Sequence, residues 1–600
     1  MTRRWCGSIA ENGGSVCWRV WAPRAERVEL VLLHGCQRRP VPMTADGQGY
    51  FHCTLSEMQE GQCYAYRLNN GPERPDPCSL RQPDGVHRPS AVFFPERFAW
   101  SDQNWQGIAP EDLVFYELHV GTFTPEGTFE AIIPRLPALR ELGITAIELM
   151  PVAQFPGSRN WGYDGVHLFA AQNTYGGPHG LQKLVDACHA AGLAIFLDVV
   201  YNHLGPEGNY LGEFGPYFTD RYRTSWGSAL NLDGPGSDAV RAFLLDNVRL
   251  WIEDFHFDGL RLDAVHAIFD SRPRHILREI KETADAASSG RRAHIIAESL
   301  VNDVRMVRAP EKGGYGLDAE WNEDFHHALH AFLTGEQHGK YSDFTQLRSL
   351  ARTLQQTFHL DGLYSRYRGR TWGAPAEGLP GDRFVIGMQN HDHVGNRPRG
   401  ERLASLVSPP KQRLAASLML LSPYLPLLFM GEEYGEEKPF PFFCSFENRQ
   451  LIENVRQGRR RDYGFAPGAV MLDPQAETTF AAARLRWSWP DGSHHAGLRR
   501  LYADLLAARK RWPALRDFTH RTVHLLPKED SPTLLHLVRG DGGLQILCNL
   551  TDDAQPIPRG IHAGRALLFS SEMKCYHGDR EPGASVEQLM PYECIALGFA

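Results

Sequence analysis

Acidic residues follow predicted strands at four places in this chain, and the side chains gathered there suit sugar chemistry. The stretches are Asp198-Val-Val-Tyr-Asn-His203, Gly259-Leu-Arg-Leu-Asp263, Ile296-Ala-Glu298 and Asn390-His391-Asp392. They end or follow the apolar runs 193–197, 257–262, 293–297 and 384–388. In a barrel of parallel strands alternating with helices, residues at the strand C-termini converge on one face, where such enzymes carry out their chemistry. The sequence therefore predicts that these side chains meet in one cleft.

Two carboxyl groups of this set could break a glycosidic bond. The reaction needs an acid that protonates the leaving oxygen and a carboxylate that faces the oxocarbenium-like centre, so the two groups must differ in pKa. We predict Asp263 as the nucleophile, kept ionised by Arg261, which points to the same face two residues earlier on the strand. Glu298 is the predicted proton donor, with its pKa raised by partial burial and nearby negative charge.

The remaining polar residues of the cleft are expected to bind or support. Asp392 and His391 should hold hydroxyl groups of the reacting ring, and His203 should do so from the third strand; bonds that strengthen at the transition state help catalysis. Asp198 and Asn202 are expected to order the site through hydrogen bonds. Because calcium prefers oxygen ligands, a calcium ion at Asp198, Asn202 and His203 remains an alternative.

Aromatic residues near the cleft are candidates for sugar platforms. We expect Trp321 and Phe325, which follow a probable sixth strand, to contact substrate, although aromatic residues there could equally fill the core. The segment from Gly205 to Asp233 lies between the third strand and its helix and is rich in Gly, Pro, Tyr and Phe. A loop this long in a compact domain is usually functional, so it should overhang the catalytic face.

These residues must be positioned by the strands and helices of an α/β protein, and the sequence divides into three parts. Residues 1–95 alternate apolar and polar positions between turns and predict a β-sandwich. Residues 110–515 alternate strands with helices and predict an eightfold (β/α)8 TIM barrel with long inserted loops. Residues 516–600 return to alternating strands and predict a C-terminal antiparallel β domain. The charge run Arg456–Asp462 is expected to be a solvated loop.

The composition of the chain excludes some classes of binding partner. The net charge of -8 provides no basic surface for nucleic acid or an anionic membrane. No signal peptide or membrane-spanning run is recognisable, which predicts a cytoplasmic enzyme. The 11 cysteines contain no CxxC pair, and no HExxH spacing occurs. We therefore predict neither a cofactor nor a metal, and we expect His326, His327 and His330 to lie on helices or packed loops.

In their order along the chain, the four stretches resemble the signature regions of the α-amylase superfamily of glycoside hydrolases. The segment Asn160-Trp-Gly-Tyr-Asp164 is similar to that superfamily's loop with a tyrosine that stacks on the cleaved ring, here Tyr163. The resemblance covers the barrel and implies a catalytic trio of Asp263, Glu298 and Asp392, with Asp392 stabilising the transition state.

Longer segments look like one family of that superfamily, the maltooligosyltrehalose trehalohydrolases. They are 198–210, 258–266, 389–396, Gly400-Glu-Arg402 and Leu428-Phe-Met-Gly-Glu-Glu-Tyr434. The resemblance implies that the substrate is a malto-oligosaccharide with a trehalose end and that trehalose is released. A glycogen branching or debranching enzyme is the alternative on the same scaffold. A glucan-binding protein with a decayed site is the alternative of another class, and the presence of all three carboxylates argues against it. Oligomeric state and preferred chain length cannot be inferred from the sequence.

Overall fold

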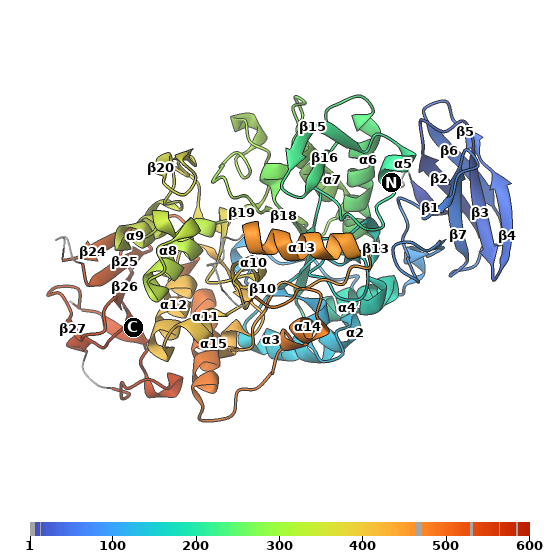
Figure 1. The fold of residues 1–600 in the computed structure, drawn as a ribbon. Helices are drawn as coiled ribbons and strands as arrows, with labels where there is room; N and C mark the ends of the chain where they lie inside the picture. Colours follow the sequence, from blue (N-terminus) through green and yellow to red (C-terminus); the bar gives the residue numbers. More distant parts are fainter. Residues whose placement is uncertain are drawn as a thin grey trace.

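The computed structural model describes residues 6–11, 14–462, 471–527, 532–562, 564–583 and 586–599. Two small sheets lie at one end of the molecule, a barrel forms the middle, and a third sheet lies at the other end (Figure 1). The predicted class, a (β/α)8 barrel between an N-terminal and a C-terminal β region, is confirmed.

The N-terminal sheets face each other across aromatic side chains. One sheet has the order β1-β2-β6-β5, and the other has the order β4-β3-β7-β8 with β9 paired to β7. Trp18 of β2 and Tyr64 of β7, both buried, meet edge to face with ring centroids 5.8 Å apart. The strands are β1 (Gly7–Glu11), β2 (Ser15–Trp21), β3 (Val28–His34), β4 (Gln37–Pro42), β5 (Thr44–Ala45), β6 (Tyr50–Leu55), β7 (Cys63–Leu68), β8 (Glu73–Arg74) and β9 (Ser90–Ala91).

Eight parallel strands close the central barrel. They are β10 (Phe115–Leu118), β11 (Ala146–Leu149), β14 (Ala194–Val199), β17 (Gly259–Leu262), β18 (His294–Ala297), β19 (Ala319–Trp321), β22 (Phe384–Gly387) and β23 (Leu425–Phe429). Nearly all of their residues are buried, because side chains fill the barrel inside and helices cover it outside. This explains why the strands appear in the sequence as short continuous apolar runs.

Helices connect the barrel strands. The longer ones are α3 (Leu136–Leu142), α4 (Gly177–Ala190), α6 (Ser237–Arg249), α7 (Ile276–Ala287), α8 (Glu323–Thr334), α9 (Leu347–Gln356), α12 (Pro409–Leu421) and α15 (His494–Arg511). The short helix α10 (His391–Gly395) begins just after β22 and carries the last signature stretch. No helix in the described ranges combines the length and the hydrophobicity needed to cross a membrane.

Two inserted segments lie over the strand ends. The long segment after β14 contains α5 (Leu211–Phe214) and the antiparallel hairpin of β15 (Phe218–Thr224) and β16 (Gly227–Leu230). The charge run expected to be a loop is instead part of helix α13 (Arg449–Asp462), so that expectation was wrong. The physical reason is local: Arg and Gln are good helix formers, and the run continues a segment without Pro.

The C-terminal sheet is anchored to a barrel helix by buried charged groups. Arg413 of α12 pairs with Glu572 (Nη2 to Oε2, 2.5 Å), and both side chains are about 95% buried, with 5% and 4% exposed. Arg539 of β25 donates to the carbonyl oxygens of Leu421 (2.8 Å) and Asp517 (2.7 Å). The sheet has the order β24 (Arg521–Leu526), β25 (Leu534–Arg539), β26 (Leu544–Asn549), β30 (Cys594–Gly598) and β28 (Ala566–Ser570).

Candidate active site

The four signature stretches lie at the C-terminal ends of the barrel strands. Asp198 is the penultimate residue of β14, Asp263 directly follows β17, and Glu298 directly follows β18. His391 and Asp392 open α10 after β22. Because the strands are parallel and adjacent in the barrel, the predicted residues share one face of the fold.

Arg261 joins three of the carboxylates. Its Nη1 donates to Asp198 Oδ2 (2.7 Å) and to Asp263 Oδ1 (2.9 Å). Its Nη2 lies 3.3 Å from Glu298 Oε2. The guanidinium is itself 1% exposed, so the interactions are screened little by water. One planar cation therefore holds the predicted nucleophile and the predicted acid beside each other.

Further hydrogen bonds fix the two carboxyl groups. Asn202 Nδ2 donates to Asp263 Oδ2 (2.9 Å), and the backbone N–H of Ala264 donates to Glu298 Oε2 (2.6 Å). Ala264 has φ 40° and ψ 51°, a left-handed conformation that costs free energy for a residue with a Cβ. The strained residue directly follows Asp263 and aims its N–H at Glu298, so the strain serves the arrangement of both groups.

Glu298 has the electrostatics of a general acid. Burial raises its pKa to about 8, with further upward contributions from the negative charges of Asp263 and Asp392, while Arg261 opposes the shift. A carboxyl group with this pKa is mostly protonated at neutral pH, although it lies beside a carboxylate. The environment of Glu298 therefore raises its pKa in the direction that a proton donor requires.

A second series of contacts runs from Asp198 through Tyr163 and His391 to Glu117. Tyr163 donates its hydroxyl proton to Asp198 Oδ2 (2.6 Å), and the same hydroxyl oxygen is 2.8 Å from His391 Nε2. His391 Nδ1 pairs with Glu117 of β10, which also accepts the backbone N–H of His391 (3.0 Å). Burial alone would lower the pKa of His391, but Glu117 outweighs it and raises the pKa to about 9.

Asp392 reaches the catalytic group from the α10 side. Its charge contributes to the raised pKa of Glu298, and its Oδ1 accepts a hydrogen bond from Asn396 Nδ2 (2.6 Å). Asn396 in turn accepts from Arg459 of α13 (2.7 Å). Helix α13, which was expected to be a solvated loop, therefore supports Asp392 through Asn396.

The two predicted aromatic platforms on β19 and α8 are not surface groups. Trp321 is 4% exposed, and the guanidinium carbon of Arg261 lies 4.3 Å from its ring centroid, so the indole supports Arg261 through a cation–π contact. Phe325 is 0% exposed and belongs to the hydrophobic core. Since a fully buried ring has no free face for a sugar, the structure corrects the expectation for Phe325, and we leave it out of the proposed site.

His203 and Trp226 form the aromatic part of the face. His203 Nδ1 pairs with Asn202 Oδ1 (2.6 Å), and its Nε2 lies 3.1 Å from the carbonyl oxygen of Tyr163. Trp226, at the tip of the β15–β16 hairpin, stacks on the His203 ring with centroids 5.0 Å apart and planes 15° apart. It is 51% exposed, so one face of the indole remains free.

The alternative of a calcium ion at Asp198, Asn202 and His203 finds little room. Asp198 Oδ2 is engaged by Arg261 and Tyr163, and Asn202 is engaged by Asp263 and His203. The guanidinium of Arg261 already neutralises Asp198 Oδ2, and it would repel a metal ion there. The contacts support the role of ordering groups for Asp198 and Asn202.

Sequence reasoning missed Glu117 and Arg459 as parts of the site. Glu117 lies inside a predicted strand, and Arg459 lies in a segment expected to be a solvated loop. Each contact joins β10 or α13 to α10 across more than one barrel unit. A buried acidic residue within an apolar strand was the one local signal for Glu117, since such groups need a partner.

The barrel with carboxylates at its strand ends defines a glycoside hydrolase of the α-amylase class. Residues 92–225 match the alpha amylase catalytic domain, and residues 6–79 match carbohydrate-binding module 48, the isoamylase N-terminal domain. A crystal structure of a Salmonella typhimurium protein proposed to be an alpha amylase superposes over 100% of both chains with a TM-score of 0.90 and 35% identity.

Curated relatives narrow the class. The malto-oligosyltrehalose trehalohydrolase of Saccharolobus solfataricus is 49% identical over 504 residues, which cover 84% of this chain and 86% of the relative. That of Brevibacterium helvolum is 42% identical over 599 residues, covering 98% and 99%. The chain belongs to the malto-oligosyltrehalose trehalohydrolase family.

Proposed function

We propose that this chain cleaves the α-1,4-glucosidic bond next to the trehalose end of a maltooligosyltrehalose, with retention of configuration, and releases trehalose and a malto-oligosaccharide. The observation that carries the chemistry is the bridge made by Arg261 between Asp263 Oδ1 and Glu298 Oε2. Family membership supports the choice of substrate. A retaining mechanism suits a close pair of carboxyl groups, because no water has to fit between them.

In the first step, Asp263 attacks the anomeric carbon while Glu298 donates its proton to the glycosidic oxygen. The C–O bond to trehalose breaks, trehalose leaves with the proton, and the malto-oligosaccharide remains as an ester of Asp263. Arg261 and Asn202 hold Asp263 as the reacting carboxylate. Asp392 and His391 are proposed to bind hydroxyl groups of the reacting ring and to stabilise its transition state, and Tyr163 is proposed to lie against that ring.

In the second step, Glu298 acts as the base. Deprotonated after the first step, it accepts a proton from water as the water oxygen attacks the anomeric carbon and the ester bond to Asp263 breaks. Both side chains return to their starting states. The chemistry needs no metal ion, since protons and a covalent intermediate carry it.

Trp226 is proposed to provide part of the surface for the trehalose unit. Sugar rings pack on flat aromatic faces, and this indole stacks on His203 with one face while its other face is free. It lies in the segment that was expected to overhang the catalytic face. Trp226→Ala should lower kcat/KM for maltotriosyltrehalose by roughly 2- to 13-fold, as expected for a contact of about 0.5 to 1.5 kcal/mol. Trp226→Phe, which keeps a flat face, should lose less.

We also propose the division of the chain at 1–95, 110–515 and 516–600, with the first part shaping one end of the cleft. Its Trp21 meets Tyr217 with ring centroids 5.2 Å apart, and its Arg74 pairs with Glu213 (2.9 Å). Both partners lie in the segment between β14 and α6 that carries the hairpin. The N-terminal sheets thus support the hairpin segment from outside the barrel.

The decisive experiment compares maltotriosyltrehalose, maltotetraose and glycogen as substrates, with products separated by chromatography. Free trehalose from the first substrate, at a kcat/KM well above that for maltotetraose, supports the proposal. Comparable rates on the two oligosaccharides, or new α-1,6 branches formed from amylose, would reject it in favour of the branching or debranching alternative. Proton NMR of the first maltotriose released should show the α-anomer before mutarotation; an initial β-anomer would reject the retaining mechanism.

A further inference from the structure

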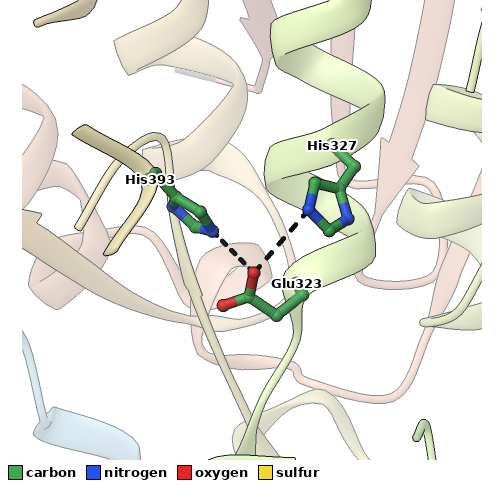
Figure 2. Close-up of side chains that lie close together, drawn as sticks. All are labelled: Glu323, His327 and His393. Atoms are coloured by element: carbon green, nitrogen blue, oxygen red, sulfur yellow. Dashed lines mark hydrogen bonds and ion pairs between the residues drawn. The ribbon is translucent and has the colours of Figure 1, made fainter. Parts of the chain in front are cut away.

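A second group of carboxylate and imidazole side chains lies between α8 and α10. Glu323 and His327 are one turn apart on α8, and His393 comes from α10 (Figure 2). Glu323 Oε2 lies 2.6 Å from His393 Nε2 and 3.8 Å from His327 Nε2. Both rings therefore point at the same carboxylate oxygen. The three side chains are 9%, 7% and 4% exposed for Glu323, His327 and His393, so the group is buried.

The hydrogen bonds within this group are incomplete. His393 satisfies one carboxylate oxygen of Glu323, but His327 Nε2 is buried and has no hydrogen-bond partner among the described residues. An unsatisfied buried ring nitrogen costs free energy that a native structure rarely leaves uncompensated. In Figure 2 this nitrogen is directed into the space between the three side chains. The group therefore leaves a ligand position free in the interior of the protein.

The donor set is one that transition metals favour. Two imidazole nitrogens and one carboxylate oxygen all lie within 4.8 Å of one another. A tetrahedral Zn²⁺ with bonds of about 2.0 to 2.2 Å places its donor atoms roughly 3.3 to 3.6 Å apart. The Glu323–His393 separation of 2.6 Å would have to lengthen by about 0.7 Å and the Glu323–His327 separation of 3.8 Å to shorten by about 0.2 Å, movements that side-chain rotations can supply. A glutamate and a histidine four residues apart on one helix need no backbone change to share an ion.

We propose that Glu323, His327 and His393 form a binding site for a divalent transition-metal ion, with Zn²⁺ as the ion that best suits two imidazoles and one carboxylate. The site joins α8 to the helix turn that carries His391 and Asp392, so its role is to hold that turn in place. It takes no part in bond cleavage and does not depend on the reaction proposed above. Its three ligands come from two helices, which is why no local spacing in the sequence reveals it.

The test measures Zn²⁺ binding to metal-free protein by competition with a chromophoric chelator, and records the visible absorption of the Co²⁺ form. A second possible ligand group, Glu437, His494 and His495, is more exposed, so the measurements use the double variant His494→Gln/His495→Gln as the reference protein. In that background we expect one equivalent of Zn²⁺ to bind, the Co²⁺ form to show tetrahedral absorption bands, and Zn²⁺ to raise the melting temperature.

Variants on α8 assign the ion to the site. His327→Phe keeps a flat ring against Tyr341 and Phe344, and Glu323→Gln keeps the size of the side chain, but each removes a ligand. Each should weaken Zn²⁺ binding by about tenfold or more. His330→Gln, one turn further on the same helix, is the matched control, because His330 is equally buried but pairs with Glu336. It should bind Zn²⁺ as the reference protein does.

Two results would overturn the proposal. One is the absence of Zn²⁺ binding once His494 and His495 are replaced. The other is full binding in folded His327→Phe protein. If the α8 variants do not fold, anomalous diffraction from Zn²⁺-soaked crystals of the unaltered protein decides the question. A peak between the three side chains supports the site, and peaks confined to other places, or no peak, reject it.

Discussion

Helix α10 presents two histidines, two residues apart, to two different surroundings, and each meets a buried glutamate. His391 pairs with Glu117 of the barrel strand β10, and His393 pairs with Glu323 of the outer helix α8. Beyond His391 the contacts continue through Tyr163 and Asp198 to the guanidinium of Arg261. Beyond Glu323 they end at His327, whose Nε2 has no hydrogen-bond partner among the residues that the structure describes.

The difference teaches what a buried histidine–glutamate pair can do in one fold. On the His391 side the contacts end at a fixed cation, Arg261, so charges alternate along them. Glu117 keeps the imidazole protonated, with a pKa of about 9, although Arg261 opposes the shift. On the His393 side the carboxylate of Glu323 lies beside His327 Nε2, a buried ring nitrogen without a hydrogen-bond partner among the described residues. The first arrangement suits the binding and orientation of hydroxyl groups, and the second suits a cation.

The largest effect on turnover should come from replacing Asp263 or Glu298, the two carboxyl groups that Arg261 holds beside each other. Asp263→Asn and Glu298→Gln should each lower kcat by several orders of magnitude without loss of fold, because one removes the nucleophile and the other the proton donor. A substrate with a good leaving group needs little protonation, so it should restore formation of the covalent intermediate in Glu298→Gln only. Pre-steady-state bursts measure this step. Equal recovery in both variants would mean that the two roles are reversed or shared.

Replacing each glutamate by glutamine compares the two sides of α10 directly. Glu117→Gln removes the charge that keeps His391 protonated, so the pKa of His391 should fall from about 9 toward its ordinary value. The imidazolium is present below that pKa and lost above it, so activity should decline with rising pH from a lower pH than in the unaltered enzyme.

Glu323→Gln is the matched change on the outer side. It should leave the pH profile of kcat/KM in place while it weakens Zn²⁺ binding. Nitrogen-15 shifts of the histidine rings report the titration of His391 independently of turnover. The same displacement of the pH profile in both variants would contradict the distinction between the two sides.

The pH dependence of the unaltered enzyme should reflect Glu298 first. With a pKa of about 8, Glu298 is protonated below pH 8 and loses its proton above it, so kcat/KM should fall as the pH rises through that value. Asp392→Asn removes a negative charge that raises this pKa, so the alkaline decline of the remaining activity should move to lower pH. With an activated substrate, Glu298→Gln should lack this decline. Its persistence there would assign it to another group.

The smallest effect on turnover should follow removal of metal. Dialysis against EDTA should leave kcat intact, because carboxylates and protons perform the reaction, while the melting temperature should fall if metal had been bound beside α8. Loss of turnover that calcium restores would instead support calcium at Asp198 and Asn202. Loss of turnover that only zinc restores would mean that an ion bound by Glu323, His327 and His393 controls the position of Asp392.

The sequence predicted the strand-end residues because each is marked by its own short pattern. Arg261 and Asp263 are two residues apart on one strand and must share a face, and Glu298 ends the next strand of the barrel. The same local information could not distinguish Trp321 and Phe325 from surface platforms. Their burial depends on how α8 packs against β22 and on where the side chain of Arg261 lies.

The partners of α10 were beyond prediction for a different reason. Glu117, Glu323 and Arg459 come from β10, α8 and α13, and they meet α10 only after the barrel has closed. The charged composition of the α13 segment indicated that it is exposed to solvent. It could not distinguish a partly exposed helix from a solvated loop, because both are rich in charged residues. Local patterns thus gave the positions of the chemical groups, while their neighbours depended on tertiary packing.

The buried contacts between α12 and the C-terminal sheet make that sheet part of the barrel's folding unit. If the chain were cut near residue 516, Arg413 would lose Glu572, and the Leu421 carbonyl at the end of α12 would lose the guanidinium of Arg539. The side of α12 that packs under β30 would also be exposed to water, which costs free energy for its apolar residues. We therefore expect the smallest independently folding form of this enzyme to retain its last eighty or so residues, although none of those that the structure describes contacts the carboxylates.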